Sequence, residues 1–236
     1  MRPGYDQSPL NPVPAVVWIL ALPVIATEAA FALAQFGFLG GGQGAGLAMR
    51  MIGVERTAFV PEMVLRMWNL FTFEPSQAYR ILTYSFVHPS FLNAVFVVVF
   101  LLALGNLVAS QFRPWAVLAL FFGSAIGGAL TYTVVRALFP QWQFPPLMGG
   151  YPAVYGFVGA FTFLLWVRLG QENANRMRAF TLIGMLLAFQ LVFAILFQDG
   201  RPVWIAELAG FAWGFILSFV LIPGGFARVR SQLRHR

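Results

Sequence analysis

Six runs of apolar residues, each long enough to cross a bilayer, constrain this chain more than any other feature of its sequence. An α-helix of about 20 residues spans the hydrocarbon core of a membrane. The composition agrees, because 59% of the 236 residues are hydrophobic and only 10% are charged, against about 25% charged in an average soluble domain. We predict one all-α membrane domain, residues 1–236, with transmembrane helices over residues 13–38, 81–108, 115–138, 152–167, 179–197 and 203–222.

The charged residues indicate how these helices are oriented. All 15 basic residues are arginines, and six spans place both termini on one side of the membrane. That side carries nine of them, namely Arg2, Arg113, Arg168, Arg176, Arg178, Arg228, Arg230, Arg234 and Arg236. The other side carries six, namely Arg50, Arg56, Arg66, Arg80, Arg136 and Arg201. Cytoplasmic loops are enriched in arginine and lysine, so we predict an integral membrane protein with both termini in the cytoplasm.

Charge and cysteine content also limit the partners and cofactors. A net charge of +7 would suggest nucleic-acid binding in a soluble protein, but these arginines flank apolar runs, so we expect no nucleic-acid partner. The basic tail, residues 223–236, is expected to contact anionic lipid headgroups, with a cytosolic protein partner as the alternative. The chain has no cysteine and only two histidines, His88 and His235. We therefore expect no disulfide, metal site or cofactor.

The first loop, residues 39–79, contains a second kind of helical signal. Five apolar residues that follow a glycine-rich run would share one face of a helix: Val60, Val64, Met67, Trp68 and Phe71. Tryptophan and phenylalanine on such a face favour a helix that lies in the membrane interface. A structured loop of this length is functional or braces the bundle, and we favour the brace.

Three motifs lie on the second, fourth and sixth predicted spans. They read YRILTYSFVH at residues 79–88, GGYPAVYG at residues 149–156 and AELAGFAWG at residues 206–214. In this order they resemble the motifs of the rhomboid intramembrane serine proteases, and the resemblance covers about residues 79–222. It implies a six-helix rhomboid-like bundle in a bacterial cytoplasmic membrane. It also implies a set of scaffold residues, namely Gly149, Tyr155, Gly156, Gly210 and Gly214.

The departures from the family pattern fall on its chemistry. Tyr151 stands at the position of the nucleophilic serine and Glu207 at that of the general-base histidine, while Asn93 and Val97 stand at the oxyanion-hole positions. We call these four residues the motif site. Acyl transfer needs a hydroxyl or thiol beside a base, and loss of one oxyanion donor alone costs about 10²–10³ in rate. We therefore predict no catalytic residues, only vestigial positions, and a catalytically inactive pseudoprotease.

The resemblance also implies a role for such a chain. Inactive rhomboid relatives as a class recognise transmembrane segments of other membrane proteins and steer their stability or assembly, so the expected partner is a client transmembrane helix. Two alternatives stay open: a structural subunit of a larger membrane complex, and a residual intramembrane serine protease. A transporter is disfavoured, because the spans hold few charges and show no inverted repeat.

Individual polar residues leave choices open. Tyr151 could fill the space of a lost site or line a site for a partner helix. A carboxylate inside a span is costly and needs a partner, so we predict that Glu207 contacts the Tyr151 hydroxyl directly or through one water, with a client-facing role as the alternative. Glu28 presents the same choice, with a lipid-accessible or partner-facing surface as its alternative. His88 is expected to fix a loop by hydrogen bonding rather than to bind a ligand.

Overall fold

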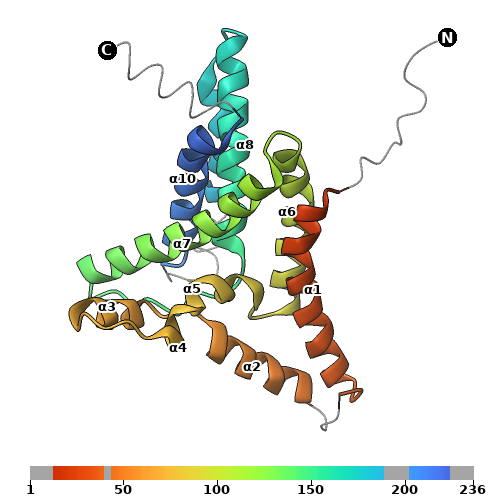
Figure 1. The fold of residues 1–236 in the computed structure, drawn as a ribbon, viewed down its shortest axis with the longest axis vertical. Helices are drawn as coiled ribbons and strands as arrows, with labels where there is room; N and C mark the ends of the chain where they lie inside the picture. Colours follow the sequence, from red (N-terminus) through yellow and green to blue (C-terminus); the bar gives the residue numbers. More distant parts are fainter. Residues whose placement is uncertain (1–12, 40–43, 189–201, 224–236) are drawn as a thin grey trace, which may run out of the picture.

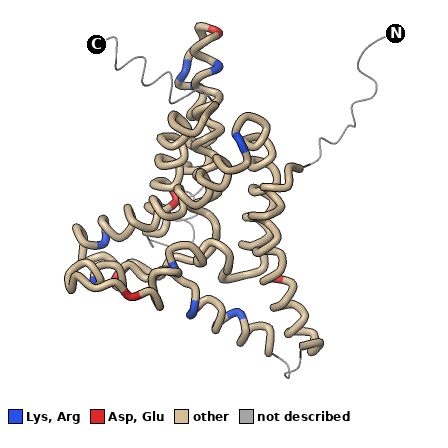
Figure 2. The backbone as a smooth tube through the Cα atoms, viewed as in Figure 1, with Lys and Arg blue, Asp and Glu red and all other residues tan. Residues whose placement is uncertain are grey.

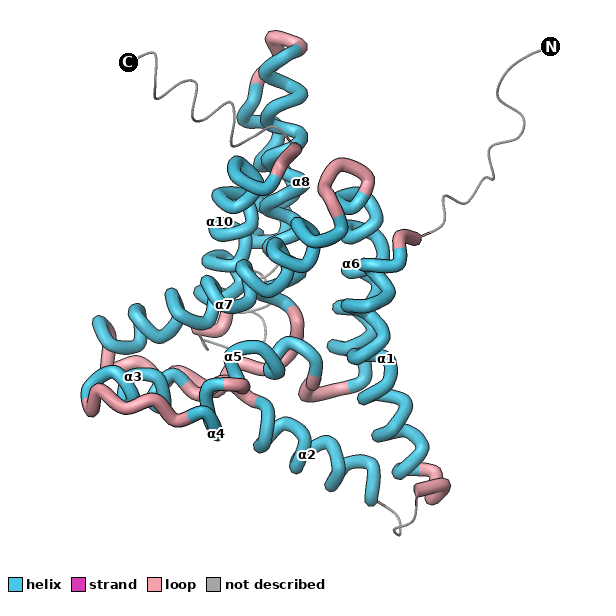
Figure 3. The backbone as a smooth tube through the Cα atoms, in the orientation of Figure 1, coloured by secondary structure: helices cyan, strands magenta, loops and turns pink. Residues whose placement is uncertain are grey.

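The computed structural model describes residues 13–39, 44–188 and 202–223. Regular structure in these ranges is helical (Figure 3), apart from one isolated bridge between Phe59 and Leu147. The described ranges contain five helices long and apolar enough to cross a membrane. These are α1 (Ala15–Gln35), α6 (Phe91–Ala109), α7 (Pro114–Leu138), α8 (Tyr151–Gln171) and α10 (Trp204–Leu221). The predicted all-α class is therefore confirmed, and the five helices point to an integral membrane protein.

The remaining predicted span, residues 179–197, lies partly outside the described residues. Its described part begins in the 3₁₀ turn η2 (Arg176–Phe180) and is helical through residues 181–188. Residues 189–197 are outside the described ranges. The sixth transmembrane helix therefore stays a prediction.

The second span begins ten residues later than predicted. Instead of one helix over residues 81–108, the chain forms α5 (Arg80–Thr83) and the 3₁₀ turn η1 (Tyr84–Phe86), and α6 starts only at Phe91. Pro89 explains the break, because proline lacks an N–H and disfavours helical conformation in the residue before it. Ser90 then caps the new helix by accepting the Asn93 N–H at 3.3 Å.

The first loop holds more helix than predicted. It contains α2 (Ala45–Thr57), which the sequence analysis missed, α3 (Pro61–Asn69) and the short α4 (Pro75–Ala78). The predicted amphipathic helix is cut short, because Phe71 follows the end of α3 with a φ of +48°. Figure 1 shows α2 to α5 lying across one end of the bundle.

Two hydrogen bonds join separate elements of this layer. The Tyr79 hydroxyl donates to the Arg56 carbonyl at 2.7 Å, and Arg80 Nη1 donates to the Glu55 carbonyl at 2.8 Å. Both bonds satisfy carbonyls at the C-terminal end of α2, which lack partners within the helix. The aromatic-Arg pair at the start of the first motif thus ties α5 to α2.

Helix α8 lies at the centre of the bundle and packs most closely against α10 and α7. A Cβ atom at Gly210 would overlap the Pro152 carbonyl, and one at Gly214 would overlap the Gly156 carbonyl. A Cβ at Gly156 would in turn overlap the Ser124 side chain of α7. These glycines let three helix backbones approach closely, as small residues do in membranes.

Candidate functional site

The motif site is built around the N-terminus of α8, whose first turn holds Tyr151 and Pro152. Proline fits this turn, because the first N–H groups of a helix have no partner within it. The chain reaches the helix through Gly149, whose φ of +89° lies in the left-handed region. A Cβ at Gly149 would also lie 3.0 Å from the His88 ring, so both conformation and space require glycine here.

His88 lies beside this turn and holds it by a hydrogen bond. The side chain is fully buried, and Nε2 accepts the Gly150 N–H at 3.1 Å. Burial lowers the pKa of His88 to about 4, and the positive charge of Arg50 acts in the same direction. The imidazole is therefore neutral at pH 7, as an accepting nitrogen must be. His88 has the loop-fixing contact that its position suggested.

Tyr151 forms a hydrogen bond to another residue of the motif site. Its hydroxyl donates to Asn93 Oδ1 at 3.1 Å, and Asn93 Nδ2 donates to Ser90 Oγ at 2.9 Å. The contact between Tyr151 and Glu207, direct or through one water, stays a prediction. The first turn of α6 presents Asn93 to the half-buried tyrosine, so the nucleophile position and one oxyanion position bond to each other.

The other two motif-site residues complete the surroundings of the α8 N-terminus. Glu207 is buried in the first turn of α10, where the helix dipole favours a negative charge. It interacts electrostatically with Tyr151 and Tyr155. Val97 is fully buried, and its Cγ1 would lie 2.9 Å from a Cβ at Gly150. All four residues of the motif site thus converge on one helix terminus.

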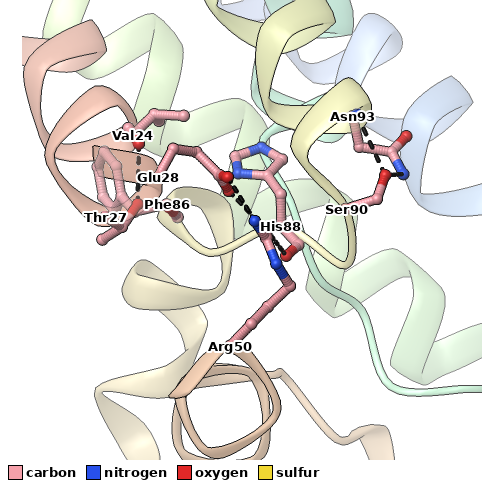
Figure 4. Close-up of polar contacts among 8 residues, drawn as sticks. All are labelled: Val24, Thr27, Glu28, Arg50, Phe86, His88, Ser90 and Asn93. Carbon is pink, nitrogen blue, oxygen red and sulfur yellow. Dashed lines mark hydrogen bonds and ion pairs between the residues drawn. The ribbon is translucent and has the colours of Figure 1, made fainter. Parts of the chain in front are cut away.

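A buried ion pair beside the site was missed by sequence reasoning (Figure 4). Arg50 of α2 donates from Nη1 and Nη2 to the two carboxylate oxygens of Glu28 in α1, at 2.7 and 2.6 Å. Arg50 Nη1 also donates to the His88 carbonyl at 3.0 Å, and the guanidinium lies 4.7 Å from the centre of the Phe31 ring. Glu28 therefore faces α2 rather than lipid or a partner. The sequence contained one signal for this ion pair, because a carboxylate within a membrane span needs a polar or charged partner.

Across residues 13–39, 44–188 and 202–223, no three His, Cys, Asp or Glu side chains gather where they could hold a metal ion. The motif site itself offers three polar groups. These are a phenol, an amide and a carboxyl group.

A first testable prediction concerns the hydrogen bond between Tyr151 and Asn93. Tyr151→Phe should lower the free energy of unfolding by about 1–2 kcal/mol, because a half-buried amide oxygen loses its donor. Asn93→Ala should cost a similar amount, and the double variant should cost less than the sum, since the two changes remove one shared bond. Reversible unfolding in mixed micelles titrated with SDS measures all three. Strict additivity would show that the bond contributes nothing.

Sequence comparisons agree with this architecture. No curated protein sequence matches the chain. A family model described as the rhomboid domain matches residues 75–224, which is more than half of the chain and contains the three motifs, all four residues of the motif site, and helices α6, α7, α8 and α10. The chain therefore belongs to the rhomboid family.

Proposed function

We propose that this rhomboid-family protein does not cleave peptide bonds and instead binds transmembrane segments of other membrane proteins, influencing their stability or assembly. One observation carries the proposal: the Tyr151 hydroxyl donates to Asn93. The residue at the nucleophile position and a residue at an oxyanion position are thus hydrogen-bonded to each other. A catalytic site would need the first free to attack and the second free to donate to an oxyanion.

The neighbouring groups also argue against hydrolysis. Pro152 has no N–H to offer a developing oxyanion. The Ser85 hydroxyl, three residues before His88, makes no hydrogen bond to it, and Nε2 of His88 already accepts from Gly150. A serine without a base at its hydroxyl is a weak nucleophile.

The same groups suit recognition of a polar residue in a client helix. Tyr151 and Asn93 are only half-buried, and each keeps unused capacity, since the phenol oxygen can accept and the amide nitrogen has a second N–H. Phe91 and Leu92, beside Asn93 at the start of α6, are exposed at 63% and 62%. Apolar side chains beside such polar groups match a transmembrane segment that carries a polar residue.

The distribution of charge supports an orientation with both termini in the cytoplasm. The start of α1, the α6–α7 turn and the C-terminal ends of α8 and α10 lie at one end of the bundle, opposite the layer of α2 to α5 (Figure 1). Charged residues gather at the helix ends and in that layer (Figure 2). We place the first end in the cytoplasm of a bacterial cell, where Arg113, Arg168 and Arg176 would meet anionic lipid. The basic tail beyond residue 223 lies outside the described residues.

The layer of α2 to α5 on the opposite side would lie in the headgroup region of the outer leaflet. Trp68 and Phe71 are exposed at 76% and 95% at the end of α3, where aromatic rings suit the headgroup region. The absence of cysteine from the chain makes topology simple to check. The cysteine introduced by Trp68→Cys should react with an impermeant maleimide added outside intact cells. Reaction only after lysis would show that the protein has the opposite orientation.

Site-directed photo-cross-linking tests the function. A benzoylphenylalanine at Tyr151 or at Asn93, in cells that express the full chain, should form adducts that map to transmembrane segments of other proteins. The matched control carries the probe at Val99 of α6, which is 54% exposed and lies on the same helix. Equal adducts from all three positions would contradict a client site. A single partner that co-purifies in fixed ratio without cross-linking would indicate a structural subunit instead.

A further inference from the structure

Residues 86–93 carry both hydrogen-bond partners of the α8 N-terminus. His88 accepts the Gly150 N–H, and Asn93 accepts the Tyr151 hydroxyl. This segment joins η1 to α6 and contains Pro89, which offers no N–H. Its position therefore determines where the first turn of α8 finds its partners.

The segment is held from the other side by α1 and α2 (Figure 4). The Thr27 hydroxyl of α1 shares its hydrogen between the Val24 carbonyl at 2.9 Å and the Phe86 carbonyl at 3.1 Å. Arg50 of α2 donates to the His88 carbonyl at 3.0 Å. Glu28 holds Arg50 in place through both carboxylate oxygens. The side chains of Arg50 and Glu28 are only 13% and 8% exposed, so water can replace little of this contact.

We infer that the Glu28–Arg50 ion pair is a positioning device for the motif site. It fixes the His88 carbonyl, and through residues 86–93 it sets the placement of Asn93 against Tyr151. Both residues of the pair lie outside residues 75–224, which match the rhomboid domain. The N-terminal part of the chain thus supplies a positioning element to a site whose own residues all lie within the domain.

Arginine suits this role better than lysine. Its planar fork binds both oxygens of a carboxylate and still has N–H groups for a third acceptor. Here the acceptors are the two Glu28 oxygens and the His88 carbonyl. Lysine at position 50 would keep the charge but could not reproduce this geometry, so Arg50→Lys should only partly retain the effect.

The inference rests on the proposed function only in naming the motif site as client-facing, and its test needs no client. The probe is 3-fluorotyrosine placed at position 151 alone, read by ¹⁹F NMR in detergent micelles well below the unfolding temperature. Asn93→Ala defines the resonance that follows loss of the Tyr151–Asn93 bond. Arg50→Gln and Glu28→Gln should each move the resonance toward that position, and Arg50→Lys should move it less.

A second Arg–Glu pair, which is more exposed than Glu28–Arg50 and lies at the other edge of the layer, provides the control. Arg136 Nε lies 2.8 Å from Glu62 Oε1, with no contact to residues 86–93. Glu62→Gln should leave the resonance at position 151 unchanged. If Arg50→Gln fails to fold, Glu28→Gln and Thr27→Ala still report on the segment, the latter by removing the bond to the Phe86 carbonyl.

Two results separate the possible outcomes. An unchanged resonance in folded Glu28→Gln and Arg50→Lys proteins, even with a lower unfolding temperature, would mean that the pair only braces the helices, and the inference would be wrong. A shifted resonance combined with no client adduct at Tyr151 would leave the positioning role intact and contradict the proposed function. The two claims can therefore fail independently.

Discussion

Arg50→Gln should lower the free energy of unfolding by about 3–5 kcal/mol, because it leaves the buried Glu28 carboxylate without its partner. Both side chains of the pair are at most 13% exposed, and the change also removes the donor to the His88 carbonyl. Removing one member of a buried pair costs more than the pair itself contributes, since the remaining charge is stranded in a medium of low polarity. Reversible unfolding with SDS, followed by tryptophan fluorescence, measures the loss.

Two controls show whether burial is the cause. Arg136→Gln breaks a pair whose side chains are 23% and 48% exposed, and it should cost at most about 1 kcal/mol. Replacing Glu28 and Arg50 together by glutamine should cost less than Arg50→Gln alone, because no charge is stranded. Equal losses for Arg50→Gln and Arg136→Gln would mean that the Glu28–Arg50 pair is solvated in the folded protein.

Stability should fall by about 3 kcal/mol as the pH is lowered from about 6.5 to 4, through the titration of His88. Burial lowers the pKa of His88 to about 4 in the folded protein, against about 6.5 in an unfolded chain. Between these values the unfolded state binds the proton and the folded state does not, so acid favours unfolding. Protonation would also remove the acceptor of the Gly150 N–H and place a positive charge near Arg50.

The comparison variant is His88→Gln, which keeps a neutral side chain that can accept a hydrogen bond. Carboxyl groups titrate near the lower end of this range in both proteins, so the measured quantity is the difference between the two pH profiles. Wild-type stability should decline toward acid more steeply than that of His88→Gln. Parallel profiles from pH 7 to pH 4 would show that His88 is protonated with its ordinary pKa.

The sequence predicted the long helices well, because length and continuous hydropathy are sufficient to identify a membrane span. It failed where neighbouring apolar residues belong to separate elements. The apolar run through Phe86 and Val87 hid the break at Pro89, and so α6 begins later than expected. Helix α2 was not predicted, and its Gly46 allows close approach to the Phe31 carbonyl of α1.

The residues of the motif site could be identified from the sequence, but their contacts could not. Motif spacing placed Tyr151, Asn93, Val97 and Glu207 on three helices. The cost of a buried carboxylate suggested a contact between Glu207 and Tyr151, but it gave no sign of the hydrogen bond from the Tyr151 hydroxyl to Asn93. The rotation and tilt of each helix decide which neighbour a side chain reaches, and periodicity alone does not determine them. The Glu28–Arg50 pair was hidden for the same reason, since its residues come from a span and from an unrecognised loop helix.

An assay for substrate cleavage by the purified protein distinguishes a protease from a non-proteolytic member of the rhomboid family. The protein is reconstituted in liposomes with fluorogenic transmembrane substrates, beside an active rhomboid protease as a positive control. We predict no product from the wild type. We also predict little or none from Tyr151→Ser with Glu207→His, because Pro152 and Val97 still offer no oxyanion donors. Substrate cleavage by the wild type that Tyr151→Phe abolishes would contradict the account, because it would make the tyrosine hydroxyl a nucleophile rather than a structural donor to Asn93.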